Sequence, residues 1–60
     1  MWETLLNQKI VVFKTDGYTK YGILKSVEYN FIFIEYEDGT LHTIRKEEIK
    51  DVKLFQGAVQ

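Results

Sequence analysis

Sixty residues make one small domain with a small core, so residues 1–60 are treated as a single domain. The absence of cysteine excludes a disulfide framework, and a single histidine, His42, argues against a metal site. Eight basic and nine acidic side chains give a formal net charge of −1, which is not the overall basic excess typical of dedicated nucleic-acid binders.

The residue pattern predicts a short helix followed by five strands. Trp2, Leu5 and Leu6 have the spacing of one helix face, which predicts about two helical turns ending near Asn7. Apolar and aromatic runs between turn residues predict strands over 9–15, 18–27, 31 onward, 41–44 and 49–55. A charged 3₁₀-like turn is expected over 45–48. Strands at this spacing are typical of small barrels and sandwiches.

Gly22 lies inside the expected second strand, after the Asp16-Gly17 turn. A glycine within a strand costs backbone entropy and packing, so it usually marks a bend, a bulge or a close backbone approach. We therefore predict such a feature at Gly22.

The stretch 31–34, Phe-Ile-Phe-Ile, is apolar on both strand faces. This pattern predicts burial on both sides or burial against a neighbouring chain. A core this small without disulfides is marginal as a lone monomer, so self-association is expected.

The chain resembles the Sm-like family in two motifs. The first is an Asp-Gly turn, a second glycine, a leucine and an acid, found here as Asp16, Gly17, Gly22, Leu24 and Glu28. The second keeps Ile44, Arg45 and Ile49 but has Lys46 and Glu48 where the family has Gly and Asn. The resemblance implies a strongly bent, five-stranded SH3-like barrel with a short N-terminal helix. It also implies a homo-oligomeric ring that binds single-stranded, uridine-rich RNA.

The family asparagine that helps to read a uracil edge has two candidate positions in this chain. An ungapped alignment places Ile32 there, whereas a turn shortened by two residues places Asn30 there. The sequence leaves both alignments open.

The resemblance implies that four residues face the pore of a ring: Tyr29, Asn30, Arg45 and Lys46. Arginine suits base stacking and phosphate contacts, but Arg45 could instead pair with Glu47 or Glu48. A further basic rim could come from Lys14, Lys20 and Lys25, although such lysines commonly form the solvated face of a strand. The expected oligomer interface comprises Leu41, Ile44, Ile49, Val52, Leu54 and Phe55.

No catalytic motif, cofactor site or small-molecule site is evident, so we do not expect an enzyme. The alternative function is a non-catalytic protein-interaction or scaffold barrel, such as a phage or archaeal-virus accessory subunit, and the charge of −1 favours it. No apolar run approaches the roughly 20 residues of a membrane span and no signal peptide is evident, so a cytoplasmic protein is expected.

Overall fold

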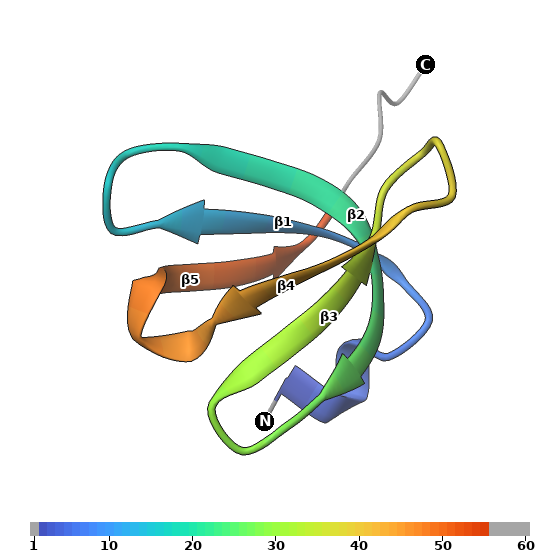
Figure 1. Ribbon diagram of the computed structural model, residues 1–60, viewed down its shortest axis with the longest axis horizontal. Helices are drawn as coiled ribbons and strands as arrows, with labels where there is room; N and C mark the ends of the chain where they lie inside the picture. Colours follow the sequence, from blue (N-terminus) through green and yellow to red (C-terminus); the bar gives the residue numbers. More distant parts are fainter. Residues whose placement is uncertain (1, 56–60) are drawn as a thin grey trace.

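The computed structural model describes residues 2–55, which form one five-stranded antiparallel sheet in the order β4-β3-β2-β1-β5 (Figure 1). Its elements are η1 (Trp2–Leu5), β1 (Lys9–Lys14), β2 (Thr19–Val27), β3 (Phe31–Glu35), β4 (Leu41–Arg45), η2 (Lys46–Glu48) and β5 (Ile49–Leu54). The predicted mostly β fold with five strands is confirmed, and each strand lies close to its expected position. No helix within residues 2–55 is long and apolar enough to cross a membrane.

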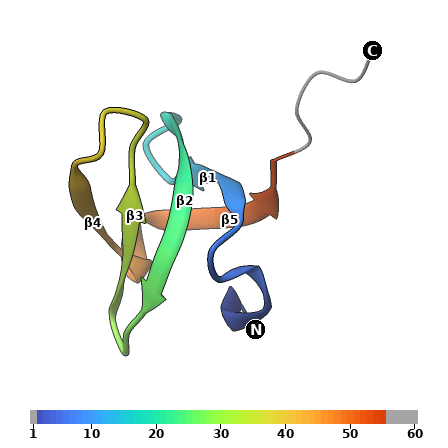
Figure 2. The ribbon, with the colours of Figure 1, turned by 90° about the vertical axis from the view of Figure 1, so that its right-hand side faces the viewer.

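The sheet is strongly bent, and its two edge strands are β4 and β5. Figure 2 shows β5 running across the direction of β2 and β3. β1 pairs with both β2 and β5, so it joins the meander β2-β3-β4 to the last strand. The sheet remains open, since β4 and β5 do not pair with each other among the described residues. Barrel closure is therefore not shown.

The core lies on the inner face of the bent sheet. Its buried side chains come from all five strands, which explains why the bend is needed to gather them: Ile10, Val12, Leu24, Ile32, Ile34, Ile44 and Val52. The side chains of Ile32 and Ile34 are completely buried, whereas Phe31 and Phe33 on the other face of β3 are half-buried. The two phenylalanine rings contact each other edge to face, with centroids 5.3 Å apart.

The N-terminal helix is shorter than predicted. Only one 3₁₀ turn forms, because the Asn7 and Gln8 backbones are hydrogen-bonded to Leu24 of β2. Asn7 takes a left-handed φ of 67°, which ends the turn and directs the chain into β1. The predicted apolar face is also only partly correct, since Trp2 and Leu5 pack on the core while Leu6 is exposed.

β2 approaches β3 closely at Gly22. A Cβ atom placed there would lie 2.7 Å from the Glu35 carbonyl oxygen and 2.7 Å from Cγ1 of Ile34. Of the three features predicted as alternatives at Gly22, a bend, a bulge or a close approach, these distances show the close approach. The register irregularity of β2 lies farther along, between Leu24 and Ser26.

Candidate nucleic-acid interface

The β2–β3 loop presents Tyr29 and Asn30 to solvent. The Glu28 amide donates to the Phe31 carbonyl at 2.8 Å, which closes the turn, and the Glu28 carboxylate accepts a hydrogen bond from Ser26. The Tyr29 side chain is 95% exposed, so no part of the described chain covers its ring. An aromatic ring held out on a tight turn is available for stacking on a planar ligand.

A second segment, from the end of β4 into η2, meets this loop. The Lys46 amide donates to the Asn30 carbonyl at 2.9 Å and joins the two segments. Together they form a depression of about 550 Å³, which we call the loop depression, lined by Tyr29, Asn30, Arg45, Lys46 and Glu47. All four predicted nucleic-acid residues thus line one surface, with one carboxylate that was not assigned to it.

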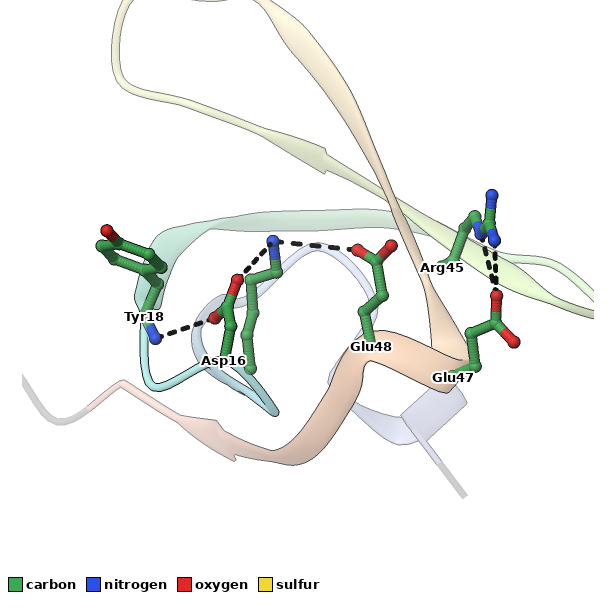
Figure 3. Close-up of polar contacts among 6 residues, drawn as sticks. Asp16, Tyr18, Arg45, Glu47 and Glu48 are labelled. Atoms are coloured by element: carbon green, nitrogen blue, oxygen red, sulfur yellow. Dashed lines mark hydrogen bonds and ion pairs between the residues drawn. The ribbon is translucent and has the colours of Figure 1, made fainter.

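Arg45 is paired with that carboxylate. Its Nε and Nη2 atoms donate to the same Glu47 oxygen, at 3.1 and 2.5 Å (Figure 3). The hydrogen bonds to Glu47, followed by the charges of Glu47 and Glu48, raise the pKa of Arg45. Both side chains are 67% exposed, so water screens the pair and it adds little stability. A phosphate could compete for this guanidinium.

The other acid of η2 turns away from Arg45. The Glu48 carboxylate lies 3.8 Å from the ammonium of Lys14, which is equally far from Asp16 on the β1–β2 turn (Figure 3). The loop depression therefore holds two cations and one carboxylate, an excess of one positive charge.

The predicted lysine rim is largely neutralised within the chain. Lys14 has its two carboxylate neighbours, and Lys25 lies 3.8 Å from Glu35. Lys20 instead lines a different hollow at the other end of the sheet. These three lysines do not form one free basic surface.

The structure distinguishes the two positions proposed for the base-reading asparagine. Ile32 is completely buried in the core, so its side chain is unavailable to a ligand. Asn30 is exposed in the loop depression beside Arg45. Of the two alignments, only the shortened turn places a polar side chain at the surface.

Five of the six predicted interface residues lie on the edge strands β4 and β5, and the sixth, Phe55, directly follows β5. Their exposure to solvent differs. Leu41 on β4 and Leu54 on β5 are exposed, at 62% and 41%. Ile44 and Val52 belong to the core of the single chain, and Ile49 and Phe55 are half-buried. The exposed leucines and the open strand edges are the parts available to another chain.

A larger hollow, of about 750 Å³, was not predicted from the sequence. It lies between the start of the β3–β4 turn and Tyr21 and Phe55, whose rings meet edge to face. The Lys9 ammonium lies 4.8 Å from the Phe55 ring centroid and 3.6 Å from Glu37. Because Lys9 already contacts both the Phe55 ring and the Glu37 carboxylate, these groups have a partner within the chain. We therefore consider this hollow a weaker candidate for a binding site than the loop depression.

Comparisons of the chain with family models, with curated proteins and with solved structures gave no match in any of the three. Within residues 2–55, no three His, Cys, Asp or Glu side chains are grouped so that they could hold a metal ion. The functional argument therefore depends on the loop depression itself.

Proposed function

We propose that this protein binds single-stranded RNA at the loop depression. The observation that carries the proposal is the meeting of an exposed tyrosine, an amide and two cations from separate loops, Tyr29, Asn30, Arg45 and Lys46. Aromatic rings stack on bases, arginine and lysine contact phosphates, and an amide can read a base edge. This combination serves a flexible strand, whose bases are open to stacking.

We further propose that the domain is an Sm-like barrel that assembles into a homo-oligomeric ring. The strand order, with β1 between β2 and β5, is compatible with such a barrel, and the open edges of β4 and β5 are available for pairing between copies. One loop depression carries a small positive excess, but rotational symmetry would repeat it around a pore. Repetition would gather these local positive charges at the pore, although each copy keeps its overall charge of −1.

The Arg45–Glu47 pair also favours a second candidate, a protein-interaction or scaffold barrel without RNA binding. In that function the pair is a surface ion pair, and the edge strands are used for protein contacts. The two candidate functions differ in whether the loop depression binds the phosphates of RNA, and this binding can be measured directly.

The decisive experiment measures fluorescence anisotropy of a labelled oligo-U at low salt with two variants of opposite effect. Arg45→Ala should weaken binding about tenfold or more, because it removes a charge-assisted contact to phosphate. Glu47→Gln should strengthen binding, because it frees the guanidinium and removes a negative charge from the loop depression. Wild-type affinity should fall with increasing salt, since counterions are released from the RNA.

A matched control is Lys53→Ala, which removes one positive charge from β5 outside the loop depression. It should change the affinity far less than Arg45→Ala. If wild-type protein shows no binding to oligo-U at low salt, the RNA proposal is wrong and the scaffold function is favoured. If both alanine variants weaken binding equally, net charge rather than the loop depression governs it.

Asn30→Ala should reduce discrimination between bases more than total affinity. Base-edge contacts specify sequence, whereas phosphate contacts hold the strand. The measurement is the ratio of the dissociation constants for oligo-U and oligo-C, compared between wild type and variant. An unchanged ratio would show that Asn30 does not read the base.

A further inference from the structure

A second hollow adjoins the loop depression. It measures about 250 Å³ and is lined by Trp2, Glu3, Val27 and Lys46. Lys46 also lines the loop depression, so the two hollows share this residue. The N-terminal turn η1 therefore borders the surface proposed to bind RNA, although the residue spacing placed Trp2 only on one face of the predicted helix.

The Trp2 ring is held in a fixed place. It is half-buried and packs against the core, as does Leu5 on the same turn. Backbone hydrogen bonds of Asn7 and Gln8 with Leu24 attach the end of this segment to β2. An aromatic ring fixed in this way loses little freedom when a ligand stacks on its open part.

The open part of the ring faces a cation that can move. The Lys46 ammonium lies 5.9 Å from the Trp2 ring centroid, at the outer limit of a cation–π contact. Lysine is a point charge on a flexible stem, and this contact is weak when solvated. A phosphate in the loop depression can therefore draw Lys46 from the ring.

We propose that Trp2 is a second base-stacking residue of the same RNA site. In the free protein Lys46 rests over the indole. When a strand binds, Lys46 turns to a phosphate and a base next to the one on Tyr29 takes its place. This inference rests on the proposed function and extends the RNA surface from the β2–β3 loop to η1. Glu3 at the edge of the hollow favours a base over a phosphate at that position.

Trp2 is the only tryptophan in the chain, so its fluorescence reports directly on this position. Titration of the wild-type protein with unlabelled oligo-U should quench the fluorescence. Quenching should saturate at the same RNA concentration as anisotropy of the labelled strand. Trp2→Ala should weaken binding about tenfold, and Trp2→Phe should retain most of the affinity because it keeps an aromatic ring.

Leu5→Ala is the matched control, because Leu5 packs on the core from the same turn but does not line the hollow. A loss equal to that of Trp2→Ala would indicate that both variants only loosen η1, and would overturn the inference. Binding by anisotropy without quenching would overturn it as well, even if Trp2→Ala failed to fold, and would leave the proposed function standing. If neither anisotropy nor tryptophan quenching detects binding, both the RNA-binding function and the role of Trp2 are refuted.

Discussion

Gly22→Val should lower the free energy of unfolding by about 1–3 kcal/mol, through overpacking of a close strand contact. The added Cβ would lie 2.7 Å from the Glu35 carbonyl oxygen, and a backbone atom cannot turn aside as a side chain can. Relief would require β3 to move away from β2, which would disturb Ile34 in the core. Chemical denaturation followed by circular dichroism measures the loss.

Two further variants isolate the cause of that loss. Gly22→Ala should already show much of it, because the close contacts involve Cβ itself. Thr19→Val, at the exposed start of β2, should be nearly neutral although it also places a valine in this strand. If the denaturation midpoints of all three variants equal that of the wild type, β3 can move away from β2 with little loss of stability, and the prediction is wrong.

The strands and most of the core follow from the sequence because burial follows residue type with a period of two. In β3 the alternation of half-buried and buried residues matches Phe31, Ile32, Phe33 and Ile34. The apolar pattern alone did not show whether the face of β3 with Phe31 and Phe33 is covered by the same chain or by a neighbouring one. The close approach at Gly22 was predictable because glycine is costly inside a strand, whereas no residue type marked the register irregularity between Leu24 and Ser26.

The length of the N-terminal helix could not be predicted, because tertiary hydrogen bonds determine where it ends. The spacing of Trp2, Leu5 and Leu6 allowed two turns, but β2 binds the backbone of Asn7 and Gln8 first. For the same reason the contact between Trp2 and Lys46 has no signal in the sequence. The two residues lie far apart in the sequence and meet only after folding.

The candidate site could be predicted only in part. The resemblance brought Asn30 and Arg45 together, and the hydrogen bond from Lys46 to Asn30 now supplies a physical reason. Residue types alone could not decide whether Glu47 or Glu48 pairs with Arg45. That choice depends on Lys14, which is near Glu48 because β1 and β5 are paired.

Leu54→Lys should convert the proposed ring into a folded monomer. Leu54 is 41% exposed in the single chain and lies on an edge strand with unpaired backbone groups. It does not belong to the buried core cluster, so the variant should fold. In an assembly that pairs β5 with a neighbouring β4, the substitution would bury a charge without a partner, which is strongly destabilising. Sedimentation velocity at micromolar concentration measures the change.

Tyr18→Lys provides the control for this prediction, because Tyr18 is 68% exposed but lies outside the predicted interface, next to the β1–β2 turn. It should sediment as the wild type does. Leu41→Lys, on the opposite edge strand, should dissociate the ring as Leu54→Lys does, since each copy would present β5 to the β4 edge of the next. A wild type that is monomeric throughout the concentration range would contradict the ring. An intact oligomer with either leucine variant would instead place the contact elsewhere than on the sheet edges.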